Sequence, residues 1–425
     1  MKTLKSICLS LLIAAGTVTG ASGQASATNI NPALLYYQAF LVAPAPLPQK
    51  EWDYLGSAEG RSKRLPERYV EIVAGYDSQF GLVRQAARAT VPCDWGTDLS
   101  AGPDTLLPYL APAKAVAVAA RLRATWDLEH NRQSDARDDL LASLTLGRNV
   151  SRDGTFISAL VQIAIEAIDC AAVAEDFGRF SPETLQQLVD GLEALPPRGT
   201  VAGCVPAEQA FLGIWMLRRI EELQRANPGD DAKVMAGIHG MFTNMFNLRA
   251  RAGMMSDSKP EEANWWERLT REAGGTSAGV ARLIRDPDPF NQKLAALLAL
   301  PYGEYQNQMK QFKVEIQQPP NPLVPLIFPA SINGRAREFK ALVFLSMVRA
   351  AVEYKLHGEP GLQSVADPCG QGPFAFRRFG LHGVDRGFEL KSVNDTGGFP
   401  QVLIFVEKEG PPFFVDGPYA GQAWR

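Results

Sequence analysis

The 425-residue chain lacks an excess of charge of either sign. It carries 43 Lys and Arg residues against 46 Asp and Glu residues, which gives a formal net charge of −3. A surface so balanced has no field that would attract nucleic acid or anionic lipid, so we expect neither as a partner. Hydrophobic residues make up 46% of the chain and charged residues 21%, as is typical of a globular protein that can bury a core.

The chain also lacks an uninterrupted apolar run of the about 20 residues that cross a bilayer. Its N-terminus instead has Lys2 and Lys5 before a short apolar stretch, residues 7–18, and a small-residue sequence, Ala25-Ser26-Ala27. This pattern predicts a signal peptide over residues 1–27. Its removal lowers the net charge from −3 to −5. We therefore expect an exported protein, periplasmic or extracellular, with no membrane span after cleavage.

Cysteine is scarce, and no C-x-x-C pair or cluster of Cys and His has the spacing of a zinc site. Cys8 lies far from the cleavage site and lacks a lipobox, so no lipid anchor is predicted. The cysteines that follow the leader are Cys93, Cys170, Cys204 and Cys369. An even number in an exported chain allows two disulfides with three connectivities. Cys170, however, lies in a helical pattern where a free cysteine packs as a small hydrophobic residue, so both states stay open.

Motifs of several enzyme classes are absent. The chain has no HExxH, no phosphate loop, no G-x-G-x-x-G and none of the Glu-Ser or Gly-Leu-Met-Gln pieces of helical lytic transglycosylases. Residues 275–279 match G-x-S-x-G, but a nucleophile elbow follows a strand, whereas residues 261–273 have a helical pattern. We interpret this stretch as a Gly-rich loop. His357 and His382 follow it, and their order in the chain assigns neither as a base.

Helical periodicity is what the sequence does have. The apolar spacing predicts helices over residues 31–40, 66–89, 111–129, 134–150, 155–177, 182–195 and 206–226. Residues 231–300 are predicted to be mainly helical, with breaks at 274–275 and 286–289. The short turn between 111–129 and 134–150 predicts an antiparallel hairpin. Short loops throughout favour stacked hairpins, although the 34-residue tetratricopeptide repeat is absent.

The spacing of the apolar residues changes from a helical to a strand-like pattern toward the C-terminus. Five prolines within residues 317–329 exclude a helix interior and predict a connector over 317–332. Residues 335–356 are apolar nearly all round, which predicts a buried helix. Short β-prone runs follow at 374–379, 388–393, 402–406 and 413–415, and they predict an antiparallel meander on that helix. The predicted fold is mainly α: stacked antiparallel helical hairpins over residues 28–316, then the connector, then a small α+β domain over 333–425.

Several segments together carry a resemblance. They are Asn31-Pro-Ala-Leu-Leu-Tyr-Tyr-Gln-Ala-Phe40, Cys93-Asp94-Trp95, the hairpin from Arg121 to Arg148 with Ala136 and Asp139-Leu140, Ile163-Ala-Ile-Glu-Ala167, Leu195-Pro196-Pro197 and Glu208. The chain resembles an uncharacterised family of exported helical proteins of planctomycete-like and acidobacterial bacteria, which implies no activity.

A second resemblance concerns the C-terminal part. A long helix followed by Asp367-Pro368-Cys369-Gly370 and short strands is similar to the end of pseudopilin-like proteins. Cys369 stands where those proteins have an aromatic residue, and their N-terminal membrane helix is missing. This resemblance implies shape and does not imply assembly into a pilus.

Two clusters have the residue types of a metal site. Glu129, His130, Asp135, Asp138 and Asp139 gather around one helical turn, where carboxylates and an imidazole suit a divalent cation. Acids in the first turn of a helix also simply favour its dipole, and Ser134 is a candidate cap. We favour this second interpretation and predict no metal and no cofactor.

The second metal hypothesis is a copper site within residues 235–255, because thioether and imidazole groups are suitable ligands for Cu(I). The residues are Met235, His239, Met241, Met245, Met254 and Met255. Met241 lies about 200° around the helix from His239, so the set does not converge and core packing is the better interpretation.

Glu166 and Glu208 are the candidate catalytic acids, because each stands alone in an apolar helical setting. Ionised Glu166 would need a partner such as Arg121, Arg123 or Arg148 on a neighbouring helix. A buried ion pair explains it best, and a catalytic acid with a shifted pKa is the alternative. Trp265-Trp266 suits stacking on a sugar, but adjacent helical positions point about 100° apart, so one of them is predicted to be core.

These observations favour a non-catalytic scaffold or binding protein of the cell envelope, whose partner is an envelope protein or polymer. The alternatives are a hydrolase acting on envelope polymers or peptides, with Glu166 and Glu208 as its acids, and a partner of a secretion or pilus-like assembly. An open cleft that holds both acids and an arginine favours the hydrolase. Full burial of both acids, each paired with a partner side chain, favours the scaffold.

Overall fold

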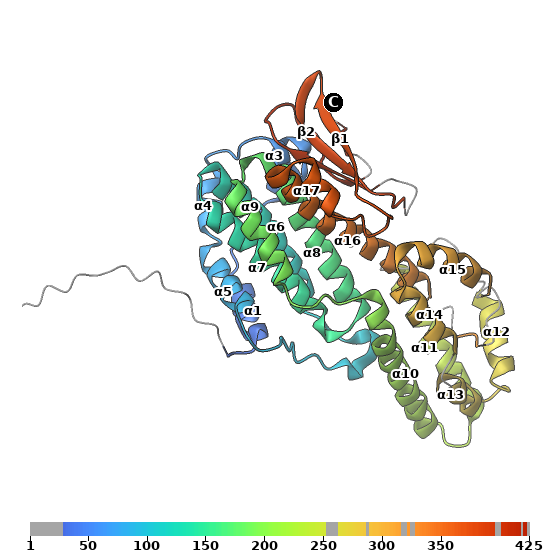
Figure 1. The fold of residues 1–425 in the computed structure, drawn as a ribbon. Helices are drawn as coiled ribbons and strands as arrows, with labels where there is room; N and C mark the ends of the chain where they lie inside the picture. Colours follow the sequence, from blue (N-terminus) through green and yellow to red (C-terminus); the bar gives the residue numbers. More distant parts are fainter. Residues whose placement is uncertain are drawn as a thin grey trace, which may run out of the picture.

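A small antiparallel sheet sits at one end of a body built almost wholly of helices (Figure 1). The structure is a computed structural model and describes residues 29–251, 262–285, 289–315, 321–323, 328–395, 401–417 and 420–422. The predicted fold class, mainly α with a small C-terminal α+β part, is confirmed. The predicted signal peptide lies outside the described residues.

The first helices form the outer side of the body. They are α1 Pro32–Leu41, α2 Gln49–Gly56, α3 Ala58–Ser62, α4 Tyr69–Ala74 and α5 Asp77–Ala87, followed by the 3-10 helix η1 Leu99–Asp104. Asn31 caps α1, since its side chain accepts a hydrogen bond from the Ala33 amide, and Pro32 occupies the first turn, where a missing N–H leaves no hydrogen bond unmade. The sequence pattern missed α2 and α3.

The prediction of one helix over residues 66–89 is wrong. The structure has two helices, and the chain turns between them at Gly75 and Tyr76. Glycine has low helix propensity, and Asp77 favours a new helix start because its charge interacts with the positive end of the dipole. The apolar residues nevertheless face one core, because Val73, Phe80 and Val83 are all buried.

The predicted hairpin is confirmed as α6 Leu110–Glu129 and α7 Gln133–Val150, which pack along each other and against α8 Phe156–Glu175. By length and composition α8 is apolar enough to cross a membrane, yet 67% of its apolar window is buried by the surrounding helices. Thr155 caps α8, and Ser181 caps the next helix, α9 Pro182–Glu193, by accepting from the Thr184 amide. α8 is thus the central helix of the body.

A second group of helices projects from the body at the lower right of Figure 1. It comprises α10 Val201–Ala226, α11 Asp231–Arg251, α12 Glu262–Glu272, α13 Ser277–Arg285, α14 Pro289–Ala299 and α15 Tyr302–Glu315. The prediction that α10 begins at residue 206 is wrong. Thr200 caps the helix by accepting from the Gly203 amide at 3.0 Å, so Pro206 lies inside α10.

The chain returns to the body through α16 Phe328–His357, which packs on α8 and α9 and is followed by the short α17 Glu359–Ser364. The predicted connector over residues 317–332 is therefore wrong at its end, because α16 begins at Phe328. Pro329 lies in the first turn, where a missing N–H leaves no hydrogen bond unmade.

The sheet has the order β1-β2-β3 and is antiparallel throughout, with β1 Ala375–Leu381, β2 Val384–Lys391 and β3 Val402–Val406. Two predicted strand ranges are wrong. β2 begins at Val384 rather than residue 388, because His382 (φ 51°) and Gly383 (φ 76°) make a tight hairpin turn. Residues 413–415 form no strand, although the Val415 carbonyl accepts from the Ile404 amide at 2.9 Å.

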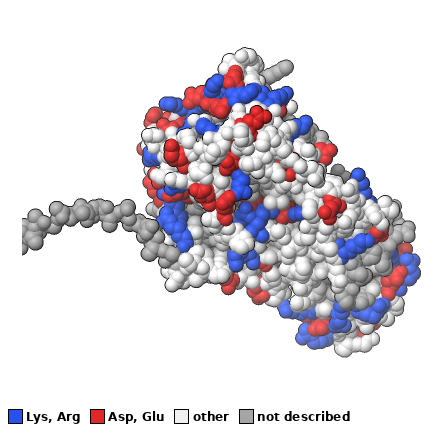
Figure 2. All heavy atoms as spheres, in the orientation of Figure 1, with Lys and Arg blue, Asp and Glu red and all other residues white. Residues whose placement is uncertain are grey.

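The hydrophobic core crosses the predicted boundary between the helical part and the C-terminal part. One cluster joins Leu140 and Phe177 of the body to Phe344 of α16 and to Phe388 and Phe405 of the sheet. Separate clusters lie under the first helices and inside the α10–α13 group. On the outside, positive and negative side chains are interspersed over the visible face (Figure 2).

Candidate functional site

Glu166, the first candidate acid, is fully buried between two arginines. Its Oε1 lies 3.2 Å from Nε of Arg148, and its Oε2 accepts from Nη2 of Arg198 at 2.7 Å. Nη1 of Arg198 also donates to Glu338 at 2.7 Å, and Glu338 pairs with Arg335 on α16. Of the predicted partners, Arg148 is confirmed. Arg198 was missed because it follows the Pro196-Pro197 turn, where no helical spacing points to α8.

Glu208, the second candidate acid, lies on α10 and has a different role. Its Oε1 accepts from the backbone amide of Phe156 at 2.7 Å, at the first residue of α8. A carboxylate at this point satisfies a free helix N–H and interacts favourably with the positive end of the dipole. Glu208 is partly buried and binds α8 at its first residue. Glu166 lies ten positions further along that helix, which is about 15 Å at 1.5 Å per residue.

The predicted metal residues of the α6–α7 hairpin turn to separate partners. These partners are Leu65 and Arg179 for Glu129, the Trp126 carbonyl for His130, Arg84 for Asp135, and Arg137 for Asp138. Across the described ranges, no three His, Cys, Asp or Glu side chains gather closely enough to hold a metal ion.

Asp139, from the same cluster, organises a cavity of about 520 Å³ between α4, α5, α6 and α7. Its two oxygens accept from Nε of Arg84 at 2.6 Å and from Nε of Arg123 at 2.8 Å. Arg84 also donates to Asp135, and Arg123 donates to Asp77 at 2.7 Å. Each arginine that faces this cavity is therefore already held by carboxylates.

Ser277, the serine of the G-x-S-x-G match, begins α13 and does not follow a strand. Gly274 and Gly275 have φ of 66° and 74°, so the stretch is the predicted Gly-rich turn. Ser277 is buried, donates to Asp231 and accepts from Gln224, and neither partner is a histidine. His382 lies in the β1–β2 turn, and His357 pairs with Glu353 on α16. This arrangement is not that of a serine hydrolase.

The methionines of α11 pack as predicted for a core. Met235, Met241 and Met245 are buried in the α10–α13 cluster, whereas His239 is exposed and lies 4.7 Å from the ring of Trp266. Met254 and Met255 lie outside the described residues. Trp265 donates from its indole nitrogen to the Pro322 carbonyl at 2.8 Å and packs on Phe242.

All four described cysteines are free and buried, so Cys170 packs as a small hydrophobic residue and no disulfide joins the described cysteines. Burial raises the pKa of Cys93, Cys204 and Cys369 to about 12 and that of Cys170 well above its usual value. A thiol that stays protonated is a poor nucleophile and a poor metal ligand. These cysteines are core residues.

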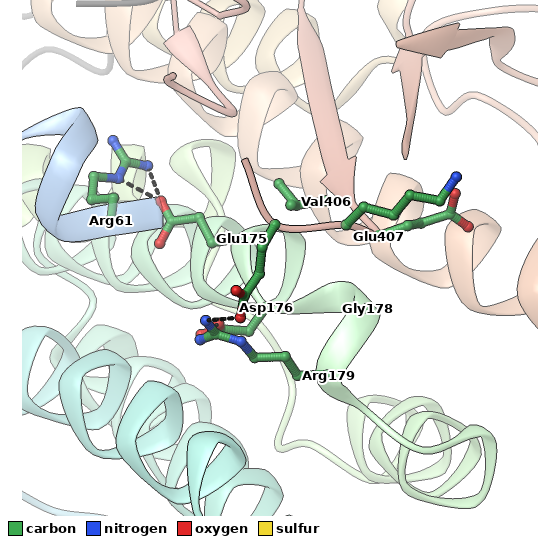
Figure 3. Close-up of a pocket in the computed structure, with 9 residues that line it drawn as sticks. Arg61, Glu175, Asp176, Gly178, Arg179, Val406 and Glu407 are labelled. Carbon is green, nitrogen blue, oxygen red and sulfur yellow. Dashed lines mark hydrogen bonds and ion pairs between the residues drawn. The ribbon is translucent and has the colours of Figure 1, made fainter. Parts of the chain in front are cut away.

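A charged cavity that no sequence pattern predicted lies at the junction of the helices and the sheet, and it is here called the junction cavity. Its volume is about 230 Å³, and it is lined by Arg61, Glu175, Asp176, Gly178, Arg179, Val406, Glu407, Lys408 and Glu409. Arg61 points to Glu175, and Arg179 points to Asp176 (Figure 3). The lining comes from α3, from the end of α8 and the 3-10 helix η3 Phe177–Arg179 that follows it, and from the end of β3 and the chain after it.

Ion pairs saturate the inner wall of the junction cavity. Glu175 accepts from Arg61 and, at 2.9 Å, from Arg121. Asp176 accepts from Arg179 at 2.7 Å and from the Thr125 hydroxyl at 2.6 Å. Burial raises the pKa of both carboxyls, and the neighbouring guanidinium groups oppose that rise.

The outer rim of the junction cavity is more accessible. Glu407 pairs with Arg378 at 2.8 Å, and Lys408, whose side chain is 61% exposed, pairs with Asp385 at 2.9 Å. Exposed pairs of this kind exchange partners at little cost in free energy. The rim thus presents positive and negative side chains to a polar ligand. The ion pairs of the inner wall instead stabilise the fold.

The fold and these sites define the class: a mainly helical protein with a small antiparallel sheet and a charged cavity at their junction. Comparisons of the chain with models of known families, with curated proteins and with solved structures find no match.

Proposed function

We propose that the protein is an exported, non-catalytic scaffold or binding protein of the cell envelope. The observation that carries this proposal is the position of Glu166, which is 0% exposed and lies between Arg148 and Arg198. A general acid must reach its substrate, and a carboxylate held in this way has neither access nor a free oxygen. Glu208 accepts a hydrogen bond from the first amide of α8, so both candidate acids have structural roles.

The rim of the junction cavity is where we expect a ligand. Its paired charges suit a polar group that carries donors and acceptors, such as a peptide segment or a glycan of an envelope polymer. The export part of the proposal depends on the leader pattern in residues 1–27. N-terminal sequencing of the exported protein tests that part, with Thr28 as the expected first residue.

The hydrolase is the second candidate, and one observation favours it. Glu175 and Asp176 are adjacent carboxyls with raised pKa values at an open cavity, which is a common property of catalytic acids. Their pairing with Arg61, Arg121 and Arg179 weighs against it, because an acid that donates its proton is not held by guanidinium groups on each side.

A thermal-shift screen of the exported protein against envelope glycans, peptides and divalent metals tests the proposal. A ligand that binds the folded state raises the melting temperature by mass action. We expect a rise with one polymer class, its loss in Lys408→Ala at the rim, and its retention in Glu353→Gln, a matched exposed-pair variant on α16. Turnover of that ligand by the wild type, abolished in Asp176→Asn, would instead establish the hydrolase.

A further inference from the structure

A second cavity, here called the α10–α11 groove, lies in the projecting group of helices, where α10, α11 and the 3-10 helix η1 line it. Figure 1 shows α10 and α11 in this group. The volume of the groove is about 860 Å³, which is within the range of about 300–1,000 Å³ that is usual for ligand sites. The groove shares no described lining residue with the junction cavity, so it is a separate site.

The floor of the groove is apolar. Met241 and Met245, one turn apart on α11, are buried, and Leu223 of α10 is partly buried. Thioether side chains adapt their shape to the apolar groups of a partner. Trp215 is the one aromatic side chain among the lining residues that the structure describes, and the backbone of Gly102 packs against its ring. The floor therefore suits aliphatic side chains.

Two carboxamide groups border this floor. Asn244 and Asn247 are exposed, lie three positions apart on α11 and form no hydrogen bond with a described residue. Each carboxamide carries an acceptor and two donors, so it can accept from an N–H and donate to a C=O of a peptide backbone. At 1.5 Å per residue the two positions are about 4.5 Å apart along the helix, so one extended chain can bond to both.

Arg218 gives the groove a positive charge that no described acid neutralises by an ion pair. Its Nη1 donates to the Ser100 carbonyl at 3.1 Å, which holds the guanidinium group against η1. The other charged residues of the lining, Arg219 and Glu222, pair with each other at 2.6 Å. Asp98 lies outside the groove and accepts from the amide and the hydroxyl of Ser100. A guanidinium group fixed in this way, with N–H groups to spare, suits a carboxylate.

Gly240 keeps the groove open. Glycine is among the least favourable residues inside a helix, so its presence there needs a reason. Gly237, one turn earlier, has a packing reason, since a Cβ atom would lie 2.6 Å from Cδ2 of Leu223. A Cβ atom at Gly240 would meet nothing within 4 Å, although Gly240 lines the groove. A side chain at this position would therefore occupy the groove without a collision with the fold.

We propose that the α10–α11 groove binds an extended peptide that carries a carboxylate. The carboxylate pairs with Arg218, an aliphatic side chain packs on Met241 and Met245, and the peptide backbone bonds to Asn244 and Asn247. A neutral glycan would leave the charge of Arg218 unused. An acidic peptide is the ligand that uses all three features of the groove at once.

Fluorescence anisotropy of the exported protein with two labelled peptides tests this site. Both peptides alternate serine and leucine; one ends in aspartate with a free carboxylate, and the other ends in asparagine amide. We expect the acidic peptide to have a dissociation constant at least about tenfold lower, because charge-assisted hydrogen bonds are about twice as strong as neutral ones. Arg218→Gln should abolish this difference and leave the affinity for the neutral peptide unchanged.

Gly240→Leu should abolish the binding of both peptides and leave the melting temperature close to that of the wild type. Gly303→Leu on α15 is the matched control, since a Cβ atom there also meets nothing within 4 Å, and it should bind both peptides normally. Lys408→Ala should bind them normally too, because Lys408 lines the junction cavity, so failure at one site is distinguishable from failure at the other.

Two results would overturn the proposal directly: a wild type that binds neither peptide, or peptide binding that survives unchanged in Gly240→Leu. A neutral oligosaccharide of N-acetylglucosamine that binds the wild type more tightly than the acidic peptide does, with binding lost in Gly240→Leu, would also overturn it and assign the groove to a glycan.

Discussion

Arg198 binds Glu166 across 32 positions of the chain, with 2.7 Å between Nη2 and Oε2. Arg198 follows α9, and Glu166 lies at the middle of α8. The same guanidinium group reaches Glu338 on α16, so one side chain ties together three segments that are far apart in sequence. The network is buried, and its charges depend on one another.

Removal of one member of this network should destabilise the fold strongly. Arg198→Met leaves Glu166 and Glu338 buried with fewer partners, and we expect a loss of about 3–5 kcal/mol in the free energy of unfolding. Urea unfolding followed by circular dichroism measures it. Glu59→Ala is the control, because the Glu59–Lys63 pair is more than half exposed and solvent screens its charges, so its loss should change the stability far less. Equal losses in the two variants would contradict the assigned role.

Asp169 should give the stability of the protein a pH dependence. Burial raises its pKa well above the usual value, and the charge of Glu166 adds to the rise. Neither carboxyl oxygen has a hydrogen-bond partner. A raised folded pKa means that the contribution of Asp169 is fully present below its unfolded pKa of about 3.9 and is lost as the pH rises through the folded value.

Asp169→Asn stays neutral at every pH and should remove this loss. We expect the variant to match the wild type near pH 4 and to exceed it in stability above the folded pKa of Asp169. Urea midpoints measured from about pH 4 to pH 9 test the sign. A variant that is less stable than the wild type at the alkaline end would show that ionised Asp169 is needed.

Gly178 should tolerate no side chain. A Cβ atom there would lie 2.5 Å from the backbone oxygen of Glu407, where the chain leaves β3. We expect Gly178→Ala to cost about 1–3 kcal/mol and to open the C-terminal segment to limited proteolysis. In the control, Gly81→Ala in α5, the new Cβ meets nothing within 4 Å and should stabilise the helix by about 0.5–1 kcal/mol.

The cysteines should be inert until the protein unfolds. Because burial raises their pKa values to about 12 or higher, the thiolate fraction at pH 8 is very small. Ellman's reagent should react slowly with the folded protein and should report four thiols after unfolding without reductant. A count of two would establish a disulfide, and a count of five would show that Cys8 and the leader remain.

Local rules predicted the central helices well. Thr155 and Ser181 cap α8 and α9, and Pro182 begins α9, all through contacts within a few residues. The prediction failed where tertiary packing decided the outcome. Gly75 ends α4 inside a continuous apolar pattern, and α16 begins at Phe328 despite the nearby prolines.

The candidate site was less predictable than the fold. Helical spacing suggested Arg148 for Glu166, because both residues lie on long neighbouring helices. The junction cavity joins Arg61, Glu175 and Glu407, which are separated by more than a hundred positions each. No local pattern connects such residues, so only the folded arrangement reveals their proximity.

α10 connects the body of the molecule to the projecting group of helices. Its first turns pack in the body through Val201 and Val205, and its far half packs through Met216 and Ile220 in the projecting group. At 1.5 Å per residue its 26 residues span about 39 Å. A tilt of about 5° at Val201 therefore moves Ala226 by about 3 Å. Pro206 removes a helix hydrogen bond, so α10 bends most easily at that residue.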